Sequence, residues 1–172
     1  MTRFPDLAGL LAYRYVNPFR NARGLQVGRV DMGVDYHGVG PIVAPGRMRV
    51  VGIGGDGWPG GCYLHLQFRR GRHKGRHMYI AEAIKPTVKV GQIVRRGRQL
   101  CTFGANAAPG RSPGIEIGWA SQVTNRTLAA ATTGYHEGEQ TPAGICFARF
   151  LHHVGCPAPS VPNAAHGREY PL

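Results

Sequence analysis

Glycine and proline divide this chain into short pieces. The 172 residues include 26 Gly and 13 Pro, and the apolar runs between them are short. This pattern suits many short strands better than long helices. No run approaches the roughly 18 consecutive apolar residues that a membrane-spanning helix needs. We therefore expect an all-β, mainly antiparallel fold in one domain with tails, because the chain is short for two full domains.

Two segments alternate strictly enough to assign side chains to faces. In the segment 30–36, Asp31 and Asp35 share one face of a predicted strand, so their carboxylates point the same way. In the segment 114–120, Glu116 shares one face with two glycines, whereas two isoleucines and a tryptophan occupy the other face. Small residues on both sides of Glu116 leave space above its carboxylate, as the floor of a site requires.

The remaining strands are expected to be short and separated by turns. A glycine-rich loop at 54–61 and two glycines six residues apart, Gly91 and Gly97, supply turn chemistry. The basic stretch 69–77 has no interleaved aromatic residue and is predicted to be a solvated hairpin loop. The expected strands cover residues 42–44, 48–53, 62–68, 77–83 and 100–103.

Only the C-terminal part has a clear helical pattern. Thr141 is a good N-cap, Pro142 suits the first helical position, and Gly155 can end the helix. An apolar face repeats between them at helical spacing, which predicts one C-terminal α-helix over about 142–154. The expected units are an N-terminal extension (1–26), a β domain (27–122) and a C-terminal extension (123–172).

The chain is strongly basic. Its formal charge is +12, and arginine outnumbers lysine by 18 to 3. Such a surface attracts polyanions, which include anionic wall polymers and nucleic acids, and charge alone does not choose between them. Four cysteines show no CxxC pair, which argues against a zinc knuckle and leaves open free thiols or a bridge between Cys146 and Cys156.

The first residues lack the pattern of a secretion signal. Pro5 and Asp6 precede a brief apolar patch, and Arg14 interrupts the apolar residues after it. Three routes stay open without such a signal: a phage virion or release by lysis, a domain cut from a longer secreted protein, or a cytoplasmic location. We expect the first, a virion or a lysis-released extracellular location.

The order of these pieces resembles the lysostaphin-like family of zinc endopeptidases, a duplicated hybrid motif fold, over about residues 27–120. The most specific element is VKVGQIVRRGRQL at 88–100, and PIVAPGRMRV at 41–50 echoes a second family motif. The paired turn in residues 88–100 also occurs in lipoyl and biotinyl carrier domains. In this chain no lysine lies in a strand turn beside it, as a carrier domain requires. The words GVDY, YIAE and IEIGWA are similar to a degenerate actinobacterial and phage branch of the family. The resemblance implies a lysostaphin-like β-sandwich or barrel.

The family's histidines are replaced in this chain. The first zinc motif, His followed four residues later by Asp, aligns with DMGVD, so Asp31 takes the place of the His and Asp35 is kept. The catalytic His of the Tyr-x-His motif aligns with Ala81, and Glu82 stands one place beyond it. The closing His-x-His aligns with Gly-Ile-Glu, which ends at Glu116.

Carboxylates in these places predict a different chemistry. Zinc sites favour imidazole and thiolate ligands, whereas Asp31, Asp35 and Glu116 offer oxygen alone, as Ca²⁺, Mg²⁺ or Mn²⁺ prefers. If the three converge, their like charges need a cation, a shared proton or the nearby Arg29. A protonated and an ionised carboxylate can also cleave glycosides, which makes Asp35, Glu82 and Glu116 the candidate catalytic residues.

The sequence therefore predicts a cell-wall-associated domain that no longer acts as a zinc peptidase and serves as a binding or virion structural module. The candidate ligand-binding residues are Arg29, Tyr79 and Trp58, since Trp58 lies in a glycine-rich loop where a groove edge is expected. The alternatives are a carboxylate-based wall hydrolase and a basic nucleic-acid-binding protein. A structural alternative is that the acids only pair with the many arginines. Peptidoglycan or an anionic wall polymer is the expected partner, and no cofactor is expected beyond a divalent cation.

Overall fold

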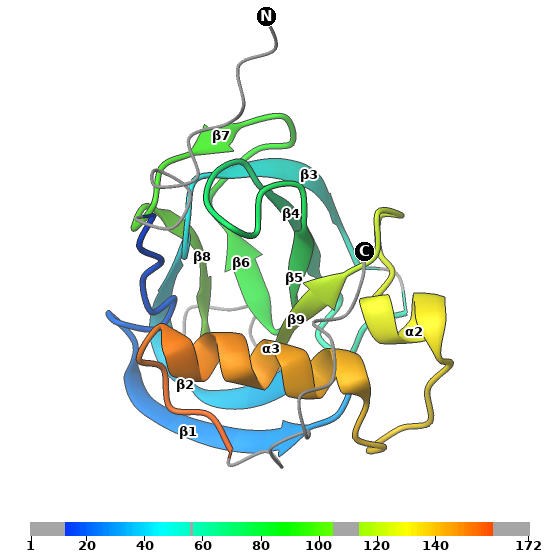
Figure 1. The fold of residues 1–172 in the computed structure, drawn as a ribbon. Coiled ribbons are helices and arrows are strands. Elements are labelled where there is room, and N and C mark those ends of the chain that lie inside the picture. Colours follow the sequence, from blue (N-terminus) through cyan, green and yellow to red (C-terminus); the bar gives the residue numbers. More distant parts are fainter. Residues whose placement is uncertain (1–12, 56, 105–113, 160–172) are drawn as a thin grey trace, which may run out of the picture.

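Strand β2 (Val34–Val43) organises the sheet. Its first part pairs with β1 (Arg23–Val30) and β9 (Ile115–Ala120), and its last residues pair with β8 (Gln99–Phe103). Because one long strand pairs with β1 and β9 along its first part and with β8 at its end, the sheet curls on itself, as Figure 1 shows. The computed structural model describes residues 13–55, 57–104 and 114–159.

Every strand pair is antiparallel, which confirms the expected all-β class. The other strands are β3 (Met48–Gly54), β4 (Tyr63–Phe68), β5 (His77–Glu82), β6 (Ile84–Pro86) and β7 (Ile93–Val94). The order across the sheet is β6-β8-β2-β9-β5-β4-β3-β7, with β1 on β2. Strands β2, β9, β5 and β4 are therefore neighbours.

The segment 30–36 contains a hairpin turn at 31–33, so the prediction of one continuous strand there was wrong. Strand β1 ends at Val30, β2 begins at Val34, and these two residues lie opposite each other. The turn packs so tightly on β9 that a Cβ on Gly33 would lie 2.5 Å from the Ile117 carbonyl oxygen. Alternating side chains can also flank a reversal that a glycine permits, and this explains the error. Asp31 therefore lies in the turn, while the side chain of Asp35 projects from the start of β2.

Helix α3 (Pro142–His153) begins where the sequence predicts it. The Thr141 side chain accepts a hydrogen bond from the Gly144 N–H, and Pro142 takes the first helical position. The apolar face of the helix packs on β9, where the Phe147 ring lies 4.9 Å from the Trp119 ring, centroid to centroid. Trp119 is buried, as expected, and the contact closes the core on the helix side of the sheet (Figure 1).

Two further features differ from the sequence-based prediction, and a third answers a question that the sequence left open. The short helix α2 (Leu128–Thr132) was missed because five residues carry too little periodicity, although Thr127 caps it. The basic loop is solvated only in part, since His73 is buried against Trp119. The four cysteines are free thiols. No helix in the part of the chain that the structure describes has the length and hydropathy of a membrane span.

Candidate functional site

Four neighbouring strands place one row of residues side by side. Tyr63 on β4 lies opposite Ala81 on β5, and Ala81 lies opposite Glu116 on β9. Glu116 in turn lies opposite Asp35 on β2. Directly paired residues project to the same face of a sheet. Two acids that are 81 positions apart in the sequence thus meet on one face, and the hairpin turn adds Asp31.

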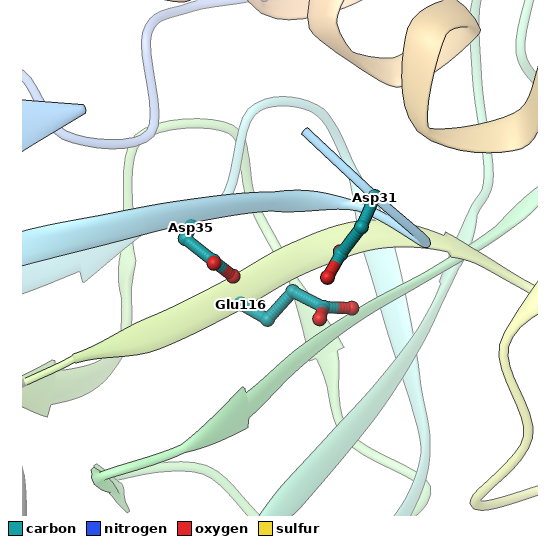
Figure 2. A group of neighbouring side chains, drawn as sticks. All are labelled: Asp31, Asp35 and Glu116. Carbon is teal, nitrogen blue, oxygen red and sulfur yellow. The ribbon is translucent and has the colours of Figure 1, made fainter. Parts of the chain in front are cut away.

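Three carboxylates converge at this point. One oxygen each from Asp31, Asp35 and Glu116 lies within 4.8 Å of the other two, and we call this group the carboxylate cluster. Figure 2 shows the three side chains pointing toward one another from the turn, β2 and β9. Asp31 is fully buried, Glu116 is 3% exposed, and Asp35 is partly open. Among the described residues, Asp31 Oδ1 has no hydrogen-bond partner.

The guanidinium of Arg29 bridges the cluster. Its Nε lies 2.9 Å from Asp31 Oδ2 and 3.0 Å from Asp35 Oδ2, and its Nη2 contacts Glu137. Half of the Arg29 side chain is exposed, so these ion pairs close the solvent side of the cluster. Arg29 therefore supplies internally part of the positive charge that a bound cation would supply.

The cluster also retains protons. Burial, followed by repulsion from Asp31 and Asp35, raises the pKa of Glu116 well above its ordinary value, which favours its protonated form. The Tyr79 hydroxyl donates a hydrogen bond to Glu116 Oε1. Burial and the charge of Asp31 raise the pKa of Asp35 to about 6, although Arg29 opposes the shift. Asp35 is thus mostly ionised at neutral pH, beside a Glu116 whose protonated form is favoured.

Glu82 lies near the cluster but outside it. Glu82 is the last residue of β5 and lies opposite Ile115. Its backbone φ is +79°, a conformation that residues other than glycine seldom adopt. A Cβ on Gly60 would lie 2.3 Å from the Glu82 carbonyl carbon, so the glycine-rich loop packs directly on this turn. Burial and the charges of Asp35 and Asp31 raise the pKa of Glu82 to about 7.

Three aromatic rings border the site. Tyr63 and Tyr79 stack with their centroids 5.3 Å apart and their planes 10° apart. The partly buried ring of Trp58 lies 5.3 Å from the Tyr63 ring and 5.5 Å from the Tyr79 ring. Trp58 therefore borders the row that holds Glu116, although its ring also packs on the sheet.

Sequence reasoning missed the contribution of the C-terminal part. The Tyr135 hydroxyl donates to Glu137 Oε2 at 2.7 Å and lies 3.3 Å from Asp31 Oδ2. The Thr141 hydroxyl donates to the Asp31 carbonyl oxygen at 2.7 Å. Glu137 could have been noticed as one of nine acids in a basic chain. Tyr135 and Thr141 gave no signal, because each lies more than 100 positions from Asp31 in the sequence.

A histidine pair lies on the same face of the sheet, on β4 and β5. His77 Nδ1 lies 2.8 Å from His65 Nε2, and burial followed by the neighbouring His77 lowers the pKa of His65 to about 4. Tyr79 separates this pair from the row of Glu116, since Tyr79 lies opposite His65. Within the described residues, no imidazole joins the carboxylate cluster.

These donors do not fit the zinc ion of the family that the sequence resembles. A catalytic zinc site needs nitrogen or sulfur ligands, and the cluster offers three carboxylates. Its oxygen atoms suit a hard divalent cation instead. The places aligned with the two catalytic histidines hold Ala81 and Gly114, and neither residue can accept a proton.

Structure comparison finds lysostaphin structures among its matches. The solution structure of lysostaphin is 16% identical, with a TM-score of 0.54, and the match covers 91% of this chain and 63% of that one. Lysostaphin from Staphylococcus simulans, described as an antimicrobial peptidase, is also 16% identical, with a TM-score of 0.54, over 94% of this chain and 60% of that one. This chain thus spans about 60% of their length. No protein-family model and no curated sequence matches. The chain has the lysostaphin fold.

Proposed function

We propose that this chain is a cell-wall-associated binding or structural domain that does not act as a zinc endopeptidase. The carboxylate cluster bridged by Arg29 is the observation that carries the proposal. It replaces the family's nitrogen ligands with oxygens, and Arg29 offsets part of their charge from within the chain. The fold supports descent from a peptidoglycan hydrolase, and the net charge of +12 favours an anionic surface as the partner.

Peptidoglycan, with or without attached anionic polymers, is the proposed partner. A virion or a lysis-released extracellular location would bring the domain to the wall. The side chains at the edge of this row that are open to solvent, Trp58, Asp35 and Arg29, provide the binding surface for glycan, because an aromatic ring stacks on sugar faces while charged groups form hydrogen bonds with hydroxyl groups.

Co-sedimentation with purified sacculi tests this function. The protein is expected to pellet with the sacculi at moderate salt and to release neither new free amines nor new reducing ends, with or without added zinc. A basic protein of similar size and charge controls for nonspecific adsorption. Zinc-dependent release of amines would show a working peptidase, and pelleting no better than the control protein would remove wall binding. Either result overturns the proposal.

A second candidate, carboxylate-based glycan hydrolysis, is favoured by the split in protonation between Glu116 and Asp35. One oxygen of each residue lies within 4.8 Å of the other, an upper limit that falls short of the roughly 6.5–9.5 Å spacing of inverting enzymes. In this function Glu116 would donate a proton, Asp35 would act as the nucleophile, and Glu82 would be an additional acid or base. The sacculi assay separates the candidates, because hydrolysis would release reducing ends that Asp35→Asn abolishes.

Replacing Trp58 by alanine is expected to weaken sacculus retention by about tenfold, which corresponds to about 1.4 kcal/mol, and to lower Tm by only a few degrees. The indole is partly open to solvent, so its loss removes a stacking face more than core volume. Pelleting titrations and thermal melts measure the two effects. Trp58→Phe keeps an aromatic ring and should retain most of the affinity. A large fall in Tm without loss of affinity would instead assign Trp58 to the core.

A further inference from the structure

Five arginines gather around one open cavity of about 640 Å³. They come from the N-terminal segment, the β2–β3 turn, the β4–β5 loop and the segment after β7. We call this the arginine pocket, and its lining residues are Tyr13, Arg14, Arg47, Arg70, Arg95 and Arg96.

The pocket lies at the other end of the sheet from the carboxylate cluster. Tyr63 begins β4 in the row of Glu116, whereas Phe68 ends β4 just before the loop that holds Arg70. Those five steps along an antiparallel strand span about 17 Å. The N–H of Arg69 donates to the Arg47 carbonyl oxygen at 2.8 Å, which ties the loop to the β2–β3 turn. The two sites are therefore separate.

Backbone contacts fix the shape of the pocket. The N–H of Arg47 donates to the Tyr13 hydroxyl at 2.6 Å, and Arg96 Nη1 donates to the Arg14 carbonyl oxygen at 2.5 Å. The Arg96 guanidinium lies over the Tyr13 ring, 5.8 Å from its centroid. The wall that Tyr13 and Arg14 form is anchored next to the core, since the Tyr15 ring packs on Phe68.

No carboxylate balances these charges in the described residues. Asp31, Asp35 and Glu137 form ion pairs with Arg29, and no acidic side chain is among the described residues that line the pocket. Five like charges held around one cavity repel each other and raise the local positive potential. A polyanion would relieve this repulsion. Guanidinium groups bind the oxygens of phosphate or carboxylate groups in pairs, and a phosphodiester polymer offers such anionic groups in series to several arginines.

We propose that the arginine pocket binds phosphodiester groups of a polyol-phosphate wall polymer, as an attachment site distinct from the carboxylate cluster. The one aromatic ring in the lining, Tyr13, already contacts Arg96 and packs edge-on against Tyr15. No lining ring is therefore left to stack on a nucleic-acid base, whereas a polyol-phosphate needs none. The choice of a wall polymer as the ligand rests on the proposed function. Phosphodiester binding at these arginines does not depend on that function, because it is argued from the pocket alone.

A double variant, Arg47→Gln with Arg95→Gln, tests the pocket. The two side chains make no hydrogen bond or ion pair within the described residues, so Tm should stay within about 2 °C of the wild type. Poly(glycerol phosphate) is the probe, and its Kd is measured by calorimetry at fixed low salt. The variant is expected to bind about tenfold more weakly. The matched control, Arg23→Gln with Lys85→Gln, removes the same charge from exposed positions outside the pocket and should bind less than twofold more weakly.

Three outcomes overturn this assignment. Equal losses in both double variants would mean that net charge alone attracts the polymer. Tighter binding of duplex DNA with the same number of phosphates, lost in the pocket variant, would make the pocket a nucleic-acid site. A collapse of Tm in the pocket variant would make these arginines structural. Sacculi stripped of phosphate polymers by hydrofluoric acid distinguish wall binding from phosphodiester binding. The wild type and the pocket variant should pellet equally with these sacculi. If neither protein pellets, only the proposed function is contradicted.

Discussion

Replacing Gly144 by alanine is expected to lower the free energy of unfolding by about 3 kcal/mol, and Tm by about 6–12 °C. Alanine is ordinarily better than glycine inside a helix by about 1 kcal/mol, so packing must decide the sign. At Gly144 a Cβ would lie 2.1 Å from the Asp31 carbonyl oxygen and 3.0 Å from its carbonyl carbon. Those atoms are backbone, so the helix must move away from the β1–β2 turn.

The movement would also disturb the site. Thr141, the cap of α3, donates its hydroxyl proton to the same Asp31 carbonyl oxygen, so a displaced helix loses that bond and loosens the turn that presents Asp31. Urea unfolding followed by circular dichroism measures the change. Gly54→Ala is the matched control, because a Cβ there meets no atom within 4 Å, and it should change stability by less than about 1 kcal/mol. A Gly144→Ala protein as stable as the wild type would show that α3 does not press on this turn.

The sequence predicted those elements whose signals are local. Alternation identified β9, and the pair of Thr141 and Pro142 located the start of α3, because cap and helix position depend on neighbouring residues. The 30–36 turn escaped because a strand and a tight reversal can share the same alternating letters. Only the pairing of Val30 with Val34 across the turn distinguishes them, and that is a tertiary fact.

The site was predictable to the extent that aligned motifs mark it. The expectation that Asp31, Asp35 and Glu116 converge came from their places in the resembled family, and the structure places them together. Tyr135 and Glu137 complete the charge network, yet no local pattern links them to residues about 100 positions away. Periodicity describes one element at a time and cannot report which distant segments meet.

Replacing Glu116 by glutamine is expected to stabilise the protein at pH 8, relative to the wild type, in the absence of divalent cations. The pKa of Glu116 is raised by folding, so between its ordinary value and its folded value the folded state binds a proton that the unfolded chain has released. Stability from this group therefore falls as pH rises through that window. The glutamine amide does not titrate and can still accept the hydrogen bond from Tyr79. The advantage of the variant should therefore grow as the pH rises above the ordinary pKa of a glutamate.

The difference between the two proteins isolates this group. Other groups respond in the opposite direction. Burial lowers the pKa of His65 to about 4, so below about pH 6.5 the unfolded chain binds a proton that the folded protein does not. The contribution of His65 therefore makes the folded protein less stable as the pH falls. Subtracting wild-type from variant stability at each pH removes that contribution. Unfolding titrations in urea at pH 5, 6, 7 and 8 give the curve. A flat difference across this range would mean that Glu116 ionises as an exposed carboxylate does.

Adding Mn²⁺ or Ca²⁺ at pH 8 turns the same pair of proteins into a test of the cluster as a cation site. A cation that binds only the folded protein stabilises it by about 3 kcal/mol at a hundredfold excess over its Kd. The wild type should gain this stability at pH 8 and lose most of it at pH 5, where protons occupy Asp35 and Glu116. Glu116→Gln should gain much less at either pH, because it lacks one ligand charge. If neither ion raises wild-type stability at pH 8, protons and the guanidinium of Arg29 alone balance the three acids, and the divalent-cation hypothesis is wrong.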